Sequence, residues 1–310
     1  MKYRIAVIPK GTTHIFWKSI HAGAIKARQE LTAAGLDVEI IWKGPLKEDD
    51  RESQIRVVED FITRGVTGIV LAPLDDAALR TPVRDAVNNG IPVVIIDSGL
   101  KSEDYVSFVA TDNYIGGRKG GEHLAKVLGG KGKVVMLRYQ EGSASTMNRE
   151  NGFLDVLKEK YPEIEVVSAN QYGGATTESA YTASENLLAP LRTPDGGLTI
   201  DGIFCPNEST AFAMLRALED SGLAGKVKYV GFDSSDRLVK GLKAGHIHGL
   251  VLQDPINMGY LGVKAIIAHL QGEEVPKRKD TGSEVATPEN MDEPKMKNLL
   301  EPDFKKWLNE

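Results

Sequence analysis

Short runs of Val, Ile and Leu alternate with longer stretches of mixed polarity along most of the chain. Runs of this length and continuity are typical of parallel β-strands that are buried on both faces of a sheet. The predicted strands are Arg4–Ile8, Val38–Trp42, Gly68–Ala72, Pro92–Asp97, Ser107–Thr111, Lys133–Leu137, Ile164–Val167, Gly202–Pro206, Val227–Phe232 and Gly249–Gln253.

The stretches between these runs read as helices, and several of them stop at a glycine, which commonly ends a helix. The predicted helices are Phe16–Ala34, Asp49–Arg64, Asp76–Asn89, Asn113–Leu128, Met147–Tyr161, Thr176–Leu188, Ser209–Ser221, Arg237–Ala244 and Pro255–Gln271. Regular alternation of strands and helices implies α/β architecture, with parallel sheets flanked by helices.

The number of strands is too large for one ordinary open sheet. We therefore predict two consecutive α/β units, one from Lys2 to about Thr111 and one from Asp112 to about Gln253. Each unit has a common domain length.

The tail that follows the last predicted helix has a different character. From Val275 it is rich in Lys, Glu and Pro. It contains one strand-like piece at Ser283–Thr287 and ends in a short amphipathic segment, Phe304–Leu308.

Composition and charge exclude several classes of protein. The chain has 310 residues and a net charge of −5, so it lacks the basic footprint of a nucleic-acid-binding protein. The single cysteine, Cys205, rules out an intramolecular disulfide and a cysteine-rich metal site. His246 and His248 form an isolated pair without a third ligand, and we expect no metal. Because GxSxG, HExxH, GxGxxG and P-loop motifs are absent, we predict neither an enzyme nor a cofactor.

Aromatic and hydrogen-bonding residues gather where the predicted strands end. Ligands of open α/β sheets lie beyond the carboxyl ends of the strands, so these residues are candidate ligand contacts. They are Lys10, His14, Phe16, Trp17, Asp97, Ser98, Arg149, Asn207, Glu208, Phe232, Asp233 and Gln253. A sugar suits such a set, because its C–H faces stack on aromatic rings and its hydroxyls both donate and accept hydrogen bonds.

Several of these candidates also have a simpler explanation. Phe16 and Trp17 could be core residues at a helix start, although adjacent helical residues point about 100° apart. Asp97 and Asp233 could be helix caps. Glu208 could bond a neighbouring loop instead of a ligand.

Seven short blocks occur in an order that resembles a known family. They are the IAVI of Ile5–Ile8 with the following Phe16-Trp17, the VVIID of Val93–Asp97, the VATDN of Val109–Asn113, the RENGF of Arg149–Phe153, the CPNE of Cys205–Glu208 and the YVGFD of Tyr229–Asp233, followed by Gln253. Nearly the whole chain resembles the ribose-binding-protein branch of the type I periplasmic binding proteins, the sugar receptors of ABC importers. The resemblance implies two Rossmann-like lobes joined by a hinge.

The resemblance also implies which residues form each lobe and which ligand contacts each lobe supplies. The first lobe would comprise residues 1–111 and 254–282, and the second would comprise 112–253 and 283–310. Phe16 and Trp17 would form a stacking wall, and Asp97 would hold adjacent hydroxyls. The implied contacts from the second lobe are Arg149, Asn207, Asp233 and Gln253, with Phe232 beside Asp233.

In such a receptor a monosaccharide or related polyol is captured by hinge closure and passed to a membrane permease. A chemoreceptor is a further candidate partner, and a monomer is the family expectation.

The chain departs from the ribose receptors at several positions. Lys10 and His14 replace small polar residues, and Ser98 stands where an arginine is common. Tyr172 is the nearest candidate for an opposite aromatic wall. The class of ligand therefore carries over, but ribose itself does not. Two alternatives stay open: a receptor for a furanosyl autoinducer, and a cytoplasmic sugar-sensing regulator domain.

The start of the chain bears on localisation. It opens directly into a strand, without the charged and apolar regions of a signal peptide. Read literally, this indicates the cytoplasm. The resemblance instead implies a periplasmic or extracytoplasmic protein whose signal sequence does not form part of this chain.

Overall fold

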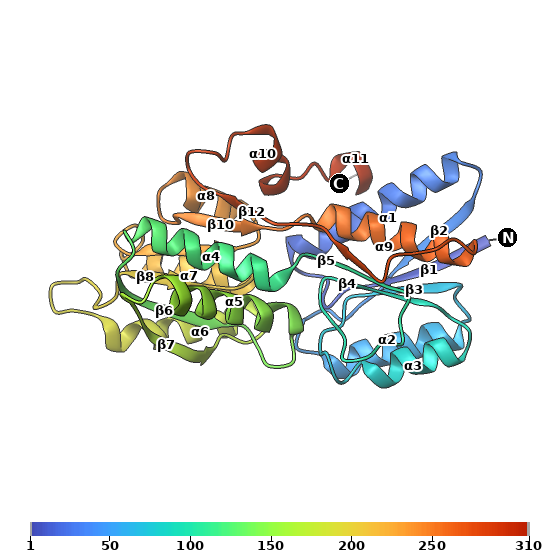
Figure 1. The fold of residues 1–310 in the computed structure, drawn as a ribbon, viewed down its shortest axis with the longest axis horizontal. Helices are drawn as coiled ribbons and strands as arrows, with labels where there is room; N and C mark the ends of the chain where they lie inside the picture. Colours follow the sequence, from blue (N-terminus) through green and yellow to red (C-terminus); the bar gives the residue numbers. More distant parts are fainter. Residues whose placement is uncertain (1, 309–310) are drawn as a thin grey trace.

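The computed structural model describes residues 2–308. It contains two six-stranded sheets, each flanked by helices, which lie side by side along the long axis of the molecule (Figure 1). We call the part built on the sheet that contains the first strand the first lobe, and the other part the second lobe. The predicted two-lobed α/β fold is confirmed.

The first lobe has a fully parallel sheet in the order β11-β5-β4-β3-β1-β2. Its strands are β1 (Lys2–Ile8), β2 (Asp37–Trp42), β3 (Gly68–Leu71), β4 (Val93–Ile96), β5 (Ser107–Ala110) and β11 (Arg278–Asp280). Its helices are α1 (Ile15–Ala33), α2 (Arg51–Thr63), α3 (Arg80–Asn88) and α9 (Pro255–Leu270). Residues of α1 and α9 pack on one face of the sheet, and residues of α2 and α3 pack on the other.

The second lobe repeats this order as β12-β10-β9-β8-β6-β7, with β12 antiparallel to β10. Its strands are β6 (Gly132–Arg138), β7 (Ile164–Tyr172), β8 (Gly202–Phe204), β9 (Lys228–Phe232), β10 (Gly249–Leu252) and β12 (Glu284–Ala286). Its helices are α4 (Asn113–Val127), α5 (Ala144–Lys160), α6 (Thr177–Leu188), α7 (Glu208–Asp220), α8 (Asp236–Lys243) and α10 (Pro294–Leu300), with the 3₁₀ turn η1 (Ala189–Leu191).

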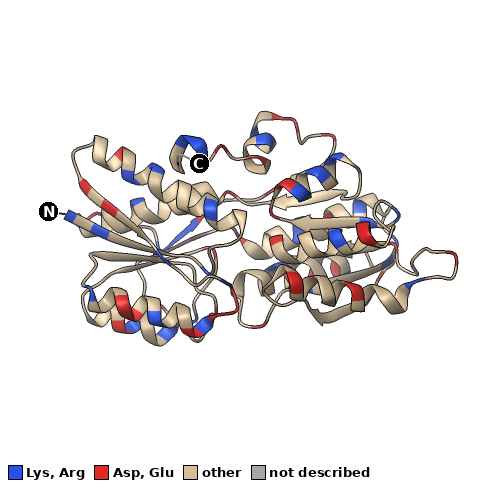
Figure 2. Cartoon of the chain, turned by 180° about the vertical axis from the view of Figure 1, so that it is seen from behind, with Lys and Arg blue, Asp and Glu red and all other residues tan. Residues whose placement is uncertain are grey.

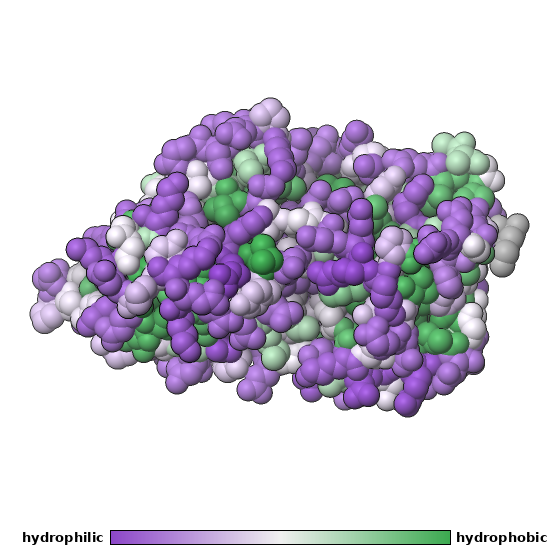
Figure 3. Space-filling view, viewed as in Figure 1, coloured by the Kyte–Doolittle hydropathy of each residue, from purple (hydrophilic) through white to green (hydrophobic). Residues whose placement is uncertain are grey.

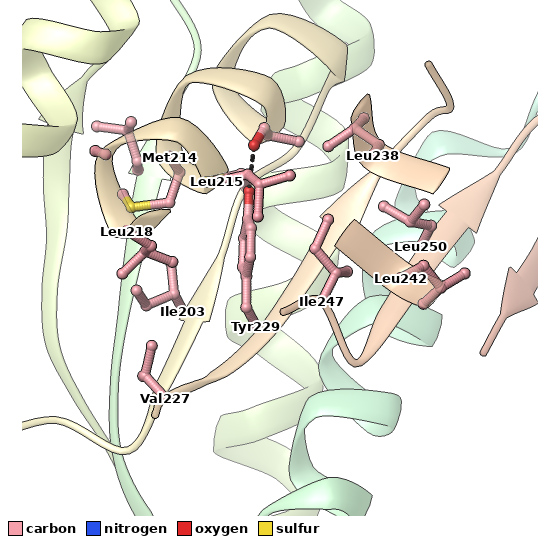
Figure 4. Packing of buried hydrophobic residues seen from close by; sticks show 14 of the residues in the cluster. Ile203, Met214, Leu215, Leu218, Val227, Tyr229, Leu238, Leu242, Ile247 and Leu250 are labelled. Atoms are coloured by element: carbon pink, nitrogen blue, oxygen red, sulfur yellow. Dashed lines mark hydrogen bonds between the residues drawn. The ribbon is translucent and has the colours of Figure 1, made fainter. Parts of the chain in front are cut away.

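The core of the second lobe contains a buried tyrosine whose hydroxyl group is hydrogen-bonded to a helix. Tyr229 of β9 stands among Leu, Ile and Met side chains of β8, α7 and α8 (Figure 4). Its hydroxyl donates to the carbonyl oxygen of Ala211 at 2.7 Å. This bond offsets the cost of burying the hydroxyl, so the ring can fill the core.

The chain passes between the two sheets three times. The passages lie between β5 and α4, between β10 and α9, and between β11 and β12. In Figure 1 these segments run close together in the middle of the molecule. A few neighbouring connections of this kind leave two packed lobes able to rotate about them.

Several elements differ from the sequence-based prediction. Strand β11 was not predicted, because its three residues are exposed and charged and join the sheet only by backbone pairing with β5. Helix α3 begins later than expected, since Asp75 accepts hydrogen bonds from the amides of Ala77 and Ala78 and holds a turn there. Helix α10 was also not predicted, although it packs in the core of the second lobe through Met296 and Leu300.

The last helix, α11 (Lys305–Leu308), lies beside α1 of the first lobe (Figure 1). The ammonium of Lys18 is 4.9 Å from the ring centre of Phe304, and that of Lys26 is 5.9 Å from the ring centre of Trp307. The tail therefore contacts the second lobe through α10 and the first lobe through α11.

The surface is mixed in charge. Lys and Arg alternate with Asp and Glu along the outer helices of both lobes (Figure 2). Hydrophilic residues dominate the face shown in Figure 3, with apolar residues in small separate groups. Within residues 2–308, no helix is both long enough and apolar enough to cross a membrane.

Candidate ligand-binding cleft

A cavity lies between the two lobes, where the carboxyl ends of both sheets meet. Its volume is about 30 Å³, and all its lining residues except His14 are buried. They are Lys10, His14, Phe16, Trp17, Glu48, Asp97, Tyr139, Ser145, Thr146, Arg149, Asn207, Glu208, Asp233 and Gln253. A space of this size holds only a few waters, so a larger molecule can enter only when the lobes separate.

Ten of the twelve residues predicted from the sequence line this cavity. The other two lie just behind it. The hydroxyl oxygen of Ser98 accepts a hydrogen bond from the amide of Ser145 across the lobes at 3.1 Å. The ring centroid of Phe232 lies 4.1 Å from the guanidinium carbon of Arg149, so the ring packs against the face of the guanidinium group.

Four lining residues were not among the predicted contacts: Glu48, Tyr139, Ser145 and Thr146. Tyr139 directly follows β6, so its strand-end position was the available signal. Glu48 lies in the connection between β2 and α2, and nothing in its local sequence indicates that it reaches the cleft. Tyr172 is not part of the lining and is 41% exposed, so its proposed place as an opposite wall is wrong.

The two aspartates occupy equivalent positions in the two lobes. Asp97 directly follows β4 and Asp233 directly follows β9, with φ angles of 61° and 68°. Among residues 2–308 they are the only non-glycine residues with positive φ. Such a conformation is unfavourable for most residues and, where it persists, often marks a functional position.

Arg149 stands between these two carboxylates. Its terminal nitrogens are 3.9 Å from Asp97 Oδ1 and 3.8 Å from Asp233 Oδ2. Its remaining N–H groups donate to Asn113 Oδ1 at 2.8 Å and to the carbonyl oxygen of Pro206 at 3.0 Å. With only 2% of the residue exposed, Arg149 is a fixed cation that both lobes share.

Close helix packing sets the position of Arg149. A Cβ atom on Gly117 of α4 would lie 1.9 Å from the carbonyl oxygen of Arg149, and one on Gly152 of α5 would lie 2.1 Å from that of Tyr114. Only glycine permits this approach, so α5 carries Arg149 directly against α4. This explains the glycine-rich segment Gly116–Gly121, which is not a phosphate loop.

The second lobe also supplies amide groups. Gln253 donates from Nε2 to Asp233 Oδ1 at 2.7 Å, while its Oε1 is buried and has no hydrogen-bond partner among the described residues. A buried acceptor of this kind suits a ligand hydroxyl. The side chain of Asn207 also caps α7, because its Oδ1 accepts from Thr210.

The first lobe supplies the aromatic side of the cleft. The rings of Phe16 and Trp17 meet edge to face, with centroids 5.0 Å apart and an angle of 89° between their planes. Lys10 lies at the end of β1, where its ammonium is 3.1 Å from Asp97 Oδ2 and donates to the hydroxyls of Ser143 and Ser145. The ammonium charge is therefore already compensated.

Glu48 organises this aromatic side. Its carboxylate accepts from Trp17 Nε1 at 2.6 Å, lies 2.6 Å from His14 Nδ1, and also accepts from the hydroxyl of Tyr139. Burial alone would raise the pKa of Glu48, but the attraction of His14, with help from Lys10 and Tyr139, lowers it to about 2. Burial alone would lower the pKa of His14, but Glu48 above all raises it to about 9. The pair is therefore ionised at neutral pH.

Glu208 carries the remaining carboxylate. It accepts hydrogen bonds from the backbone amides of Phe16 at 3.1 Å and Ile15 at 3.4 Å, in the other lobe. Burial raises the pKa of Glu208 to about 7, against the opposing attraction of His14. Burial likewise raises the pKa of Asp233, against the opposing effects of Arg149 and Gln253.

The cleft thus combines a charge-compensated set of donors and acceptors with two flat rings. Together with the two lobes and their three connections, this defines a binding protein that encloses a small polar molecule. A family model described as periplasmic binding protein domain matches residues 5–274. The chain therefore belongs to the periplasmic binding protein family, whose members bind substrates.

Characterised relatives match over most of their length. The chain is 30% identical to the D-allose-binding periplasmic protein of Escherichia coli over 280 residues, which is 87% of this chain and 86% of the relative. It is also 30% identical to the D-ribose/D-allose-binding protein of Pseudomonas aeruginosa, over 90% of this chain and 86% of the relative.

Solved structures agree with these matches. A carbohydrate transporter solute-binding protein of Agrobacterium radiobacter, in complex with D-arabinose, is 35% identical with a TM-score of 0.88 and covers 96% of this chain and 99% of its own. An ABC transporter solute-binding protein of Agrobacterium vitis with bound D-fucose is 34% identical, with the same TM-score and the same shares of the two chains.

Proposed function

We propose that this protein is the solute-binding receptor of an ABC importer, and that it captures a monosaccharide or related polyol between its lobes. The observation that carries this proposal is the buried cleft in which Arg149 joins Asp97 and Asp233 beside the rings of Phe16 and Trp17. Carboxylates and a guanidinium order hydroxyl groups, while rings cover C–H faces. Relatives and solved structures with the same architecture bind sugars.

Capture follows from closure. When the lobes separate, the residues of each half become accessible; a ligand that touches both halves then stabilises the closed form. Closure removes water, so hydrogen bonds between hydroxyls and the buried carboxylates strengthen. We propose that the lobes comprise residues 1–111 with 254–282, and residues 112–253 with 283–310.

We propose the predicted candidates as ligand contacts, with Ser98 and Phe232 supporting them from behind. Glu48, Tyr139, Ser145 and Thr146 join the set. No catalytic step, cofactor or metal is needed for this function.

Family and relatives support an extracytoplasmic location, with a membrane permease as the protein that recognises the closed form. We propose a monomer, with a chemoreceptor as a further candidate partner.

A thermal-shift screen tests the proposal, with pentoses, hexoses, polyols, sugar acids and a furanosyl autoinducer, followed by calorimetry on each hit. A ligand at about 100 times its Kd should add about 2.7 kcal/mol to the free energy of unfolding. A neutral sugar or polyol should give the largest rise in melting temperature. A rise in melting temperature with the furanosyl autoinducer alone would contradict the sugar assignment.

The variant Asp97→Ala tests the site itself. It removes an acceptor from the closed cleft and leaves Lys10 without its carboxylate, so binding should weaken by about 3 kcal/mol. Calorimetry with the ligand from the screen measures the change. Unchanged affinity would show that the ligand binds elsewhere.

A further inference from the structure

Two carboxylates cross the cleft in opposite directions. Glu48 belongs to the first lobe and accepts a hydrogen bond from the hydroxyl of Tyr139 in the second lobe. Glu208 belongs to the second lobe and accepts from the amides of Ile15 and Phe16 in the first. Both carboxylates are buried, so each bond exists only while the lobes are together.

Helix α1 needs the bond from Glu208 for a local reason. Its N-cap residue, His14, makes no side-chain capping bond, and its first turn contains no acidic residue. The first amides of a helix require acceptors, and the helix dipole favours a negative charge there. Here the acceptor comes from the opposite lobe, so closure completes the cap of α1.

Glu48 makes the matching connection from the other side. The same carboxylate that bonds Tyr139 also accepts from Trp17 and contacts His14, and Gln140 Nε2 donates to the backbone oxygen of Glu48 at 3.2 Å. The segment His14–Trp17 is thus held between a carboxylate from each lobe. Closing the lobes therefore adds a bond from the Phe16 backbone to Glu208 and a bond from Tyr139 to Glu48, the carboxylate that holds Trp17.

We propose that Glu48 and Glu208 form a reciprocal latch, which stabilises the closed form through bonds between the lobes and positions His14, Phe16 and Trp17. The proposal rests on the proposed function only in assuming that the lobes open and close. In this role the two carboxylates are positioning residues. The latch sets how far the free protein is closed before a ligand arrives.

The distance between the lobes tests the latch without any sugar. Fluorescent labels attached through Val87→Cys in the first lobe and Val167→Cys in the second report this distance, because both positions are exposed. The natural thiol of Cys205 is buried, and burial raises its pKa to about 12, so it stays unlabelled. Energy transfer between the labels then gives the ratio of open to closed protein.

The test variants are Glu208→Ala, Glu48→Gln and the conservative Tyr139→Phe, which removes only the hydroxyl that crosses the lobes. Each should raise the open-to-closed ratio by about tenfold, the change expected when one charged hydrogen bond is lost. Circular dichroism checks that each variant is folded, and Tyr139→Phe keeps the test valid if a glutamate variant does not fold.

Glu150→Gln is the matched control. Its carboxylate is buried, as those of Glu48 and Glu208 are, but it accepts from Arg138 and from the backbone amide of Tyr139 within the second lobe. This variant should lower the melting temperature and leave the open-to-closed ratio unchanged. If no latch variant changes the ratio, the latch is wrong. The two proposals can fail separately. If the latch variants raise the open-to-closed ratio as expected but no sugar binds the protein, the latch is supported and the receptor function is contradicted.

Discussion

The two lobes share one architecture but bring different chemistry to the cleft. Each has the same strand order, and each places one aspartate with a positive φ after an inner strand. The first lobe adds two rings and two cationic groups, Phe16, Trp17, Lys10 and His14. The second adds a guanidinium and two amides, Arg149, Asn207 and Gln253. A repeated fold therefore supplies two similar frames, and the residues around their strand ends differ: one set forms an aromatic wall and the other a hydrogen-bonding clamp.

The helix pairs at the core of each lobe show the same contrast. In the first lobe, Gly23 and Gly259 let α1 and α9 approach, since a Cβ atom on either would lie within 2.0 Å of a carbonyl oxygen of the other helix. In the second lobe, Gly117 and Gly152 do the same for α4 and α5. Only in the second pair does a carbonyl group that meets one of these glycines belong to a cleft residue, Arg149.

The largest loss of ligand affinity is expected when the cation that the two lobes share, Arg149, is removed. Arg149→Ala leaves Asp97 and Asp233 buried close together without the charge that joins them. We expect ligand binding to weaken by about 4 kcal/mol, because a buried ion pair has lost one partner. Calorimetry measures the loss, and Arg216→Ala, at an exposed pair with Asp220, is the control with little expected effect. Equal effects of the two variants would contradict the role of Arg149.

One added methyl group at each helix crossing should distinguish the effects of the two helix pairs on stability and on ligand binding. Gly23→Ala and Gly117→Ala should each lower the free energy of unfolding by about 2 kcal/mol through overpacking. Gly117→Ala should also weaken ligand binding more than Gly23→Ala does, because it displaces the backbone of Arg149 itself. Urea unfolding and calorimetry on both variants separate the two effects. Equal affinities would mean that the crossing does not position Arg149.

A rise in pH should lower the stability of the protein through one group in each lobe, His14 in the first and Glu208 in the second. The pKa of His14 is raised to about 9 and that of Glu208 to about 7, both above their ordinary values. Their contributions to stability are complete below those ordinary values and are lost as the pH rises through 7 and then 9. We expect the free energy of unfolding to fall by about 1–2 kcal/mol between about pH 6 and 9.5.

Urea unfolding across this range measures that dependence. His14→Gln should remove its upper part and leave the part near pH 7. A profile that is flat for the unmodified protein would contradict a protonated His14 beside Glu48.

The smallest effect is expected outside the cleft. Tyr172 ends β7 with its ring exposed, so Tyr172→Ala should change ligand binding by less than about 0.5 kcal/mol. Tyr139→Ala, at the end of neighbouring β6, should weaken binding clearly. Calorimetry on the pair shows which tyrosine faces the ligand, and a strong effect at Tyr172 would contradict the present geometry.

The two-lobed architecture and most of the residues that line the cleft could be predicted from the sequence. Continuous apolar runs specify buried parallel strands, and parallel strands place their carboxyl ends at one edge, so strand-end residues such as Asp97 and Gln253 could be predicted to face a ligand. Two sheets rather than one followed from the number of strands.

The remaining features depend on contacts between segments that are far apart in the sequence. Strand β11 has no apolar signal, since backbone pairing alone places it. Glu48 reaches the cleft because folding brings a connection of the first lobe against Tyr139, about ninety residues away along the chain. Glu208 caps a helix of the other lobe. Contacts between groups so distant in sequence depend on how the two lobes meet, and local patterns of polarity carry no information about that meeting.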